Sequence, residues 1–309
     1  MEFRFERFTD ERLHDFQELF RKVFNRTLSI QYIQKKYDNS LHNGKYLGFL
    51  AYTSGDLPVG FFGVTFYQLE YRGKCHTAAQ CGDVMTDPEY QGKGLFTELG
   101  RMTQDLARQE NLSLIYAFPN QNSFPGFIGK LGWRVTGNMR CYIVPVKALP
   151  FESVLRKLGF AGIYRKFAER TIRPLLSTDR VLASTFIDEE HGGVRHDQRF
   201  FNYKSYTDNY ALSLHDCKVW IKVNGAIHVG DMEDVEDEKR VKVMVALKRL
   251  ARRLGVNRII FQTSAETHLD RYLSRYYTGT DSFPIIFYDI ASPVSLEKLQ
   301  FTYGDLDSF

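Results

Sequence analysis

A short stretch of the chain, PEYQGKGLFTEL from Pro88 to Leu99, combines residue types that suit anion binding. It places two glycines and a lysine where a predicted strand passes into a predicted helix. Backbone N–H groups at a helix start have no partner inside the helix and carry the positive end of its dipole, and glycines let an anion approach them closely. The stretch therefore predicts a pyrophosphate site made by the amides of Gln91, Gly92, Lys93, Gly94, Leu95 and Phe96, with Thr97 adding a hydroxyl.

Several other chemistry-bearing motifs are missing from the sequence. The glycines fit neither GxxxxGK[ST] nor the GxGxxG that follows the first strand of a dinucleotide-binding fold. The eight histidines show no HExxH spacing, the four cysteines form no CxxC pair, and no serine lies in a GxSxG elbow. We therefore expect no metal cofactor and no serine nucleophile.

The elements around the glycines must hold them at the end of a sheet. Apolar residues at helical spacing predict a helix from Leu13 to Phe24, after the short strand FRFERF. Runs rich in Val, Leu, Phe and Tyr, separated by turn signals, predict strands further along the chain. The expected order is then strands over 46–53, 59–71 and 77–86, a helix over 95–110, a strand over 112–117, a helix over 124–131 and a strand over 133–146.

The stretch VMTDPEYQGKGLFTEL resembles the acetyl-CoA-binding motif of the GCN5-related N-acetyltransferases, the GNAT superfamily. Their pattern, Arg/Gln-x-x-Gly-x-Gly/Ala, is matched by Gln91 and Gly94, whereas Phe96 departs from the final small residue. The order of elements over residues 1–146 also agrees with that fold. The resemblance implies that the loop amides hold the pyrophosphate of acetyl-CoA, and that its pantetheine arm lies along Val84, Met85 and Thr86, with Asn120 as a support.

Acetyl transfer to an amine needs a group that accepts a proton from the amine. Asp83 is the main candidate, since a carboxylate in the stretch CGDVMT is costly unless it is paired or used; a structural Asp bonded to backbone amides is the alternative. His76 and Tyr116 are weaker candidates. Family members often protonate the leaving thiolate with a Tyr, but Phe127 or Ile128 holds that place here, so another group serves or the thiolate leaves unassisted.

The C-terminal part of the chain repeats this pattern. Gly82-Asp83-Val84-Met85 aligns with Gly230-Asp231-Met232-Glu233 at an offset of 148 residues, and Leu106-Ala107 aligns with Leu250-Ala251 at an offset of 144. Four residues are therefore missing from the second copy, at the place where the first copy has its glycines, and six carboxylates surround the gap. Because these carboxylates repel a pyrophosphate, we expect the second copy to complete an acceptor pocket and to stabilise the first, without binding coenzyme A.

The repeat predicts an α+β (mixed α/β) protein with tandem GNAT-like domains, each a twisted, mostly antiparallel sheet flanked by helices. We expect a catalytic, acetyl-CoA-binding domain over residues 1–148, a basic amphipathic helical connector over 149–178 and a degenerate domain over 179–309. The acidic tail, with Asp305, Asp307 and the terminal carboxylate of Phe309, either enters the active site as a base or docks elsewhere.

The connector contains six basic and two acidic side chains between Phe151 and Leu176. An amphipathic segment of this kind either packs its apolar face on a domain or rests on anionic lipid. A peripheral membrane contact through residues 151–176 is therefore one of two interpretations.

Composition limits the class of function. The net charge is +4, and we find no membrane-spanning run, no signal peptide pattern and no clustered basic character, so we expect a cytoplasmic protein with no nucleic-acid partner. The GNAT resemblance implies an N-acetyltransferase (an acyltransferase) acting on a small-molecule primary amine. The GD-x-M-T-x-P loop, the FPN turn and the KLGW segment also resemble bacterial enzymes of cell-surface polysaccharide synthesis, which favours an amino sugar, free or nucleotide-linked, as the acceptor. The alternatives are a non-catalytic acyl-CoA sensor and a transferase that uses another donor such as aminoacyl-tRNA, which has no need of the glycines. The sequence leaves the acyl length and the oligomeric state open.

Overall fold

The computed structural model describes residues 2–37, 46–182 and 188–309, and the chain divides into two compact units. The first unit comprises Met1–Gly137 and Phe283–Leu299. The second comprises Asn138–Ser282 and Gln300–Phe309. The end of the chain therefore contributes to both units.

The first unit is built on a mixed sheet. Its strands are β1 (Arg4–Arg7), β2 (Leu47–Tyr52), β3 (Pro58–Tyr71), β4 (Lys74–Thr86), β5 (Leu114–Ala117) and β12 (Thr280–Asp289). They lie in the order β1-β2-β3-β4-β5-β12. All neighbours are antiparallel except β4 and β5, which are parallel because a helix connects them. The unit thus keeps a parallel pair at the centre of a mostly antiparallel sheet.

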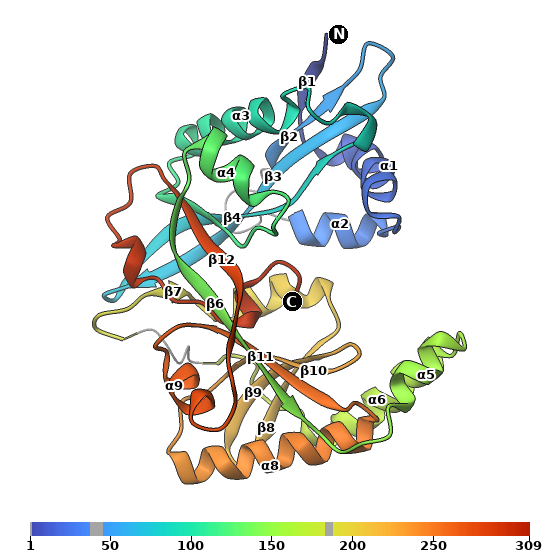
Figure 1. Ribbon diagram of the computed structural model, residues 1–309, viewed down its shortest axis with the longest axis vertical. Coiled ribbons are helices and arrows are strands. Elements are labelled where there is room, and N and C mark those ends of the chain that lie inside the picture. The colour runs from blue at the N-terminus through green and yellow to red at the C-terminus, as the bar shows by residue number, and fades with distance from the viewer. Residues whose placement is uncertain (1, 38–45, 183–187) are drawn as a thin grey trace. The chain divides into compact units, whose positions relative to one another are not determined.

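Helices cover both faces of this sheet (Figure 1). They are η1 (Asp10–Arg12), α1 (Leu13–Phe24), α2 (Ile30–Tyr37), η3 (Pro88–Tyr90), α3 (Leu95–Gln109), α4 (Phe124–Leu131) and η6 (Leu296–Lys298). Successive side chains of β3 point to opposite faces. Phe61 packs on Phe16 of α1 at 4.7 Å between ring centroids, whereas Phe62 packs on Phe127 of α4 at 5.8 Å. One strand therefore supplies both hydrophobic cores of the unit.

The strands of the second unit also pair mostly antiparallel. Its strands are β6 (Arg134–Pro145), β8 (Asn209–Leu214), β9 (Cys217–Val223), β10 (Ile227–Met232) and β11 (Arg258–Ser264), with a short β7 (Gly193–Val194) apart from them. The order is β6-β11-β10-β9-β8, and β10 and β11 form the parallel pair. Its helices are α5 (Phe151–Lys157), α6 (Ala161–Ile172), η4 (Arg173–Leu175), α7 (Gln198–Tyr203), η5 (Lys204–Tyr206), α8 (Asp237–Leu254), α9 (His268–Ser274) and η7 (Tyr303–Asp305).

The order of elements recurs along the chain. The series β2-β3-β4-α3-β5-α4-β6 is followed later by β8-β9-β10-α8-β11-α9-β12. The last strand of each series pairs in the sheet of the other, because β6 joins β11 and β12 joins β5. The boundary between the compact units therefore lies within β6, after Gly137, whereas the sequence predicted a domain boundary at residue 148.

The predicted mixed α/β fold with a mostly antiparallel sheet and flanking helices is confirmed. Most predicted elements of the first unit have the expected type, with β4 starting at Lys74 and α2 as an addition. Within the described ranges no helix is long and apolar enough to cross a membrane. The same ranges contain no cluster of three His, Cys, Asp or Glu side chains placed to hold a metal ion.

Candidate active site

The strand β4, which leads to the glycines, stops pairing with β5 several residues before its own end. β4 pairs with β5 only from Ala78↔Leu114 to Cys81↔Ala117. On its other side β4 carries a bulge, because Asp83 and Val84 together face the single residue Phe62 of β3. Asp83 takes a positive φ of 51° there. Val84, Met85 and Thr86 thus lie beyond the last β4–β5 pair, with the edge that faced β5 open.

The residues Gln91–Gly94, named here the glycine loop, run directly into α3. Gly92 and Gly94 have φ angles of +76° and +84°, a region that strongly favours glycine. A Cβ added to either would meet no atom within 4 Å. Gly94 is the N-cap of α3 and offers no side-chain cap, so the first-turn N–H groups of Leu95 and Phe96 have no partner within the helix. The glycines are needed for backbone shape and for open space in front of these amides.

A groove of about 790 Å³ lies in front of the glycine loop, entirely within the first unit. Nine of the eleven residues that the sequence assigned to cofactor binding line it: Val84, Thr86, Gln91, Gly92, Gly94, Leu95, Phe96, Thr97 and Asn120. The open edge of β4 and the start of α3 thus face one space. A pyrophosphate at the amides and an extended arm along β4 both fit this arrangement.

Two of the predicted cofactor residues do not line the groove. Met85 is 1% exposed and belongs to the core between β3 and α1. The Nζ of Lys93 lies 4.5 Å above the ring of Tyr90. Since alternate residues of a strand face opposite sides, Met85 can contribute backbone groups to the groove but no side chain.

Phe96, the departure from the family pattern, turns its ring away from the loop into the core. The ring packs against Phe62 and Phe127, with centroids 5.7 and 5.3 Å away. A Cβ on Gly126 of α4 would lie only 2.7 Å from Cε1 of Phe96. Gly126 therefore makes room for the large residue, and the backbone amide of Phe96 stays at the groove.

The groove also has walls that the sequence did not predict. Val23 and Phe24 come from the end of α1, and Asn122, Ser123, Pro125, Gly126 and Lys130 come from the turn before α4 and from α4 itself. The turn PNQNS was a visible signal for the second group. No sequence signal predicted Val23 and Phe24, because only tertiary packing brings the end of α1 to the same groove as the glycine loop.

Asn120 is committed to shaping this turn. Its Oδ1 accepts hydrogen bonds from the backbone N–H groups of Asn122 at 2.9 Å and Ser123 at 3.1 Å. Its amide nitrogen is the part that remains for a ligand.

Asp83, the predicted base, is held by two side chains of α2. Its Oδ2 lies 2.5 Å from Nζ of Lys36 and accepts a hydrogen bond of 3.0 Å from the hydroxyl of Tyr37. The side chains of Lys36 and Asp83 are 6% and 14% exposed. The carboxylate is therefore paired, as a structural role requires, while Oδ1 has no hydrogen-bond partner among the described residues.

The weaker candidates lie elsewhere. Tyr116 is fully buried in β5, with its ring 6.0 Å from that of Tyr67. His76 lies eight residues before Val84 on β4, roughly 26 Å away at the rise of an extended strand. Phe127 is 2% exposed in the core. None of the three lines the groove, and neither does Asp83, which precedes the lining residue Val84.

An ion pair between the exposed Lys22 and the buried Asp87 anchors the approach to the glycine loop. Asp87 is fully buried; its Oδ1 accepts a hydrogen bond from the N–H of Glu89, and its Oδ2 lies 2.7 Å from Nζ of Lys22. Hydrogen bonds to Asp87 and Glu89 raise the pKa of Lys22. The end of α1, which lines the groove, is thereby tied to the turn before the loop.

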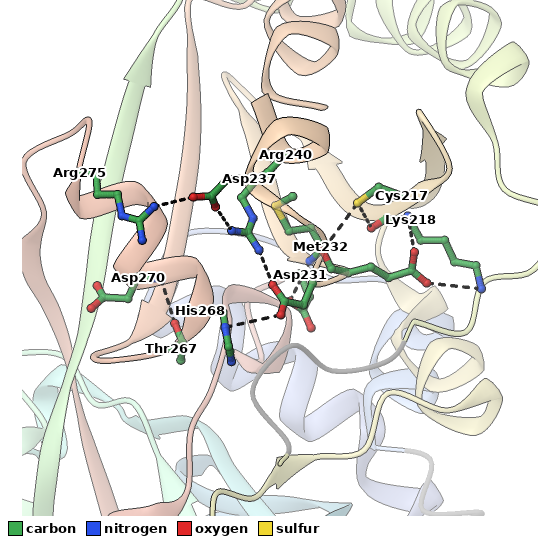
Figure 2. A network of polar contacts seen from close by, with 12 residues as sticks. Cys217, Lys218, Asp231, Met232, Asp237, Arg240, Thr267, His268, Asp270 and Arg275 are labelled. Atoms are coloured by element: carbon green, nitrogen blue, oxygen red, sulfur yellow. Dashed lines mark hydrogen bonds and ion pairs between the residues drawn. The ribbon is translucent and has the colours of Figure 1, made fainter. Parts of the chain in front are cut away.

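The corresponding place in the second unit, at the start of α8, is filled by ion pairs. Arg240 pairs with Asp234 and, at 2.9 Å, with Asp237, which also lies 2.6 Å from Arg275 (Figure 2). The segment carries carboxylates where the first unit has glycines. An anion would meet negative charge there instead of open amides.

The C-terminal residues fill the space beside β10, the counterpart of β4. Parallel pairing of β10 and β11 ends at Val229↔Phe261, and Thr302 of the tail then forms a bridge with Thr263 of β11. Phe309 is 1% exposed and packs on Trp220 at 4.6 Å. A Cβ on Gly230 would lie 2.6 Å from the ring of Phe309. The tail is thus part of the core of the second unit.

A buried Asp-His-Asp cluster fastens this tail. Nε2 of His196 lies 2.7 Å from Oδ1 of Asp305, and its Nδ1 lies 3.2 Å from Oδ2 of Asp231, the residue that aligns with Asp83. Burial alone would lower the pKa of His196, but Asp305 and Asp231 outweigh it and raise the pKa to about 9. Burial also raises the pKa of Asp231.

Comparison with known families agrees with this geometry. Residues 4–136, less than half of the chain, match the family model described as acetyltransferase (GNAT) domain. This part of the chain is similar to the GNAT acetyltransferases. No curated protein matches the sequence significantly.

Solved structures of GNAT proteins share the fold. A GCN5-related N-acetyltransferase from Kribbella flavida is 14% identical, with a TM-score of 0.61 over 94% of this chain and 72% of its own. Another from Anabaena variabilis is 11% identical, with a TM-score of 0.57 over 93% and 72%. A glucosamine N-acetyltransferase region of a fungal multi-domain β-N-acetylglucosaminidase is 14% identical, with a TM-score of 0.51 over 93% and 38%. At these identities the likeness concerns the fold alone.

Proposed function

We propose that this chain is an acetyl-CoA-dependent N-acetyltransferase whose donor site is the groove of the first unit. One observation carries the proposal: the open edge of β4 and the two positive-φ glycines face the same space. Acetyl-CoA would supply the acetyl group from its thioester, with coenzyme A as the leaving thiol. The amides of Gln91 through Phe96 would bind its pyrophosphate, and the backbone of Val84, Met85 and Thr86 would hold its extended arm.

Asp83 is the proton acceptor that we propose for the amine. Because Oδ2 is engaged by Lys36 and Tyr37, the proton would go to Oδ1. The ion pair orients the carboxylate and fixes it beside the bulge. A primary amine of a small molecule is the acceptor class, with an amino sugar first, in keeping with the glucosamine substrate named for one structural relative.

A non-catalytic acyl-CoA sensor is the second candidate. Two observations favour it: the predicted base is paired, and the place of the usual Tyr is held by Phe127 or Ile128, neither of which can donate a proton. The sensor requires the same groove, so only turnover separates the two candidates.

We further propose that the second unit is a degenerate GNAT-like copy, which makes the chain a tandem protein. Its element order repeats that of the first unit, while α8 starts at ion pairs and the tail occupies the side of β10. Among the described residues, the start of α8 therefore has no glycine loop, and the tail lies beside β10 where the arm of coenzyme A would otherwise run.

Isothermal titration with acetyl-CoA tests the donor site. Gly94→Trp should abolish binding, because the indole fills the groove and the residue strains a φ of +84°. Gly73→Trp is the matched control, since Gly73 has a φ of +68° and equally open surroundings in the turn between β3 and β4, but does not line the groove. Equal binding by both variants, or none by the wild type, contradicts the assignment.

A thiol-release assay over a panel of amines that includes glucosamine then separates enzyme from sensor. The enzyme releases coenzyme A faster with at least one amine than without it. Binding of acetyl-CoA with no amine-dependent release across the panel favours the sensor.

A further inference from the structure

The segment around α5 and α6 exposes more large apolar side chains than any comparable stretch of the described chain. We name these six residues the α5–α6 stripe. Their exposed fractions run from 41% to 82%: Leu149, Val154, Leu158, Phe160, Ile163 and Phe167. Single exposed apolar residues are ordinary, but six of them within 19 residues are unusual and point to an interaction surface.

The stripe stays exposed although α6 is firmly packed. Tyr164, Ala168 and Ile172, at helical spacing, belong to the core of the second unit. The hydroxyl of Tyr164 also donates a hydrogen bond of 2.9 Å to the carbonyl of Leu254. Phe160, Ile163 and Phe167 lie at i, i+3 and i+7 on the neighbouring face of the same helix. The helix thus has two apolar faces, and folding covers only one of them.

Basic residues border the exposed face. Lys166, Arg170 and Arg173 follow at steps of four and three residues on the side of the stripe away from the core. Together with Lys157, they make no ion pair with any residue that the structure describes. By contrast, Arg165 of the same helix pairs with Glu169 at 3.0 Å and with Asp208 at 3.1 Å.

This combination selects one class of partner. A nucleic acid would pair with the cations but leave Leu158, Ile163 and Phe167 in water. An apolar protein groove would cover the apolar residues but has no need of unpaired cations beside them. A membrane with anionic lipids offers both features, because its acyl chains are apolar and its headgroups are negatively charged.

We propose that the α5–α6 stripe lies in the interface of an anionic membrane, with the apolar side chains among the acyl chains and Lys157, Lys166, Arg170 and Arg173 at the headgroups. Figure 1 shows α5 and α6 at the edge of the second unit, where they are not enclosed by its sheet. The contact is peripheral and leaves the fold of the unit unchanged. It would place the protein at a membrane surface, whatever acceptor it uses.

Vesicle sedimentation with the full-length protein tests the proposal. The wild type should sediment with vesicles of phosphatidylcholine and phosphatidylglycerol in equal parts, and much less with phosphatidylcholine alone. Replacing Lys166, Arg170 and Arg173 by Gln should weaken binding roughly a hundredfold, and added salt should weaken the wild type in the same way. The triple variant L158E/I163E/F167E should abolish binding to both kinds of vesicle.

Val241→Glu/Val245→Glu is the matched control, because these valines of α8 are 46% and 42% exposed in the same unit. This variant should bind as the wild type does, and all variants should keep the circular dichroism spectrum and melting temperature of the wild type.

The proposal is overturned if the wild type ignores anionic vesicles, binds both vesicle types equally, or loses binding equally in the α8 control. It is also overturned if the wild type sediments as a dimer without lipid while the stripe variant is monomeric, because a second copy then covers the face.

Discussion

Lys36 and Asp83 form an ion pair, with Nζ and Oδ2 2.5 Å apart and both side chains largely shielded from solvent. The pair joins α2 to the bulge of β4, next to the open edge that we assign to the donor. Asp83, the proposed base, therefore also links α2 to β4. Its catalytic and structural roles can be tested separately.

Asp83→Asn should lower kcat roughly a hundredfold to ten-thousandfold, the usual contribution of a general base. The amide keeps the size of the side chain and its bond to Tyr37, so acetyl-CoA binding should persist. Steady-state kinetics across pH and calorimetry measure the two effects. Asp105→Asn, on the exposed side of α3, is the control. If folded Asp83→Asn kept full activity across the pH range, Asp83 would not be the base and only its structural role would remain.

Gly126→Ala should destabilise the protein by about 1–3 kcal/mol, because its Cβ would lie 2.7 Å from Cε1 of Phe96. Gly129→Ala, on the same helix with open surroundings, should instead stabilise it by about 0.5–1 kcal/mol. Chemical denaturation of both variants tests the difference. When Phe96 is replaced by Leu, Gly126→Ala should lower the free energy of unfolding by less than it does in the wild type. An unchanged loss of free energy would show that the two residues are not coupled.

Stability should fall as pH rises from about 6.5 to about 9. The pKa of His196 is raised from 6.5 to about 9 in the folded protein by Asp305 and Asp231, so its contribution is complete below 6.5 and lost as pH passes through about 9. Burial raises the pKa of Asp231, so its contribution to stability also falls as pH rises above its ordinary pKa of 3.8. Burial lowers the pKa of His228, which therefore costs stability only below 6.5.

The free energy of unfolding measured across this pH range checks the expectation. His196→Gln should be less stable by about 3–5 kcal/mol at neutral pH, because it leaves buried carboxylates without a cation, and its stability should vary less with pH. His191→Gln, at a half-buried histidine that pairs with Asp188 outside the cluster, should retain the wild-type dependence. Identical pH profiles of the wild type and His196→Gln would refute the assignment.

Phe309→Ala should destabilise the protein by about 3–5 kcal/mol, since it removes a buried ring from Trp220. It should leave the affinity for acetyl-CoA unchanged, because the tail is part of the second unit and does not line the groove. Tyr276→Ala, at 60% exposure, should have little effect on either. A change in affinity without a change in stability would instead bring the tail to the donor site.

The sequence predicted the parts of this protein that depend on neighbours in the chain. The glycines before α3 and the strand-to-helix order can be read locally, because φ constraints, periodicity and capping act within a few residues. Nine of the predicted cofactor residues line one groove, and eight of them come from the contiguous stretch of β4, the loop and the start of α3; their role in binding stays a prediction.

The tertiary structure decided what depends on distant segments. No local pattern could show that Lys36 would pair with Asp83, that Val23 and Phe24 would line the groove, or that Phe96 would fit over Gly126. Nor could it show that β6 and β12 would each complete the other sheet, because strand pairing is chosen by packing and not by sequence proximity. The need for glycine at these positions is set by the local backbone conformation. The charged pair beside the groove and the residues that form its walls are set by which distant segments come together in the folded protein.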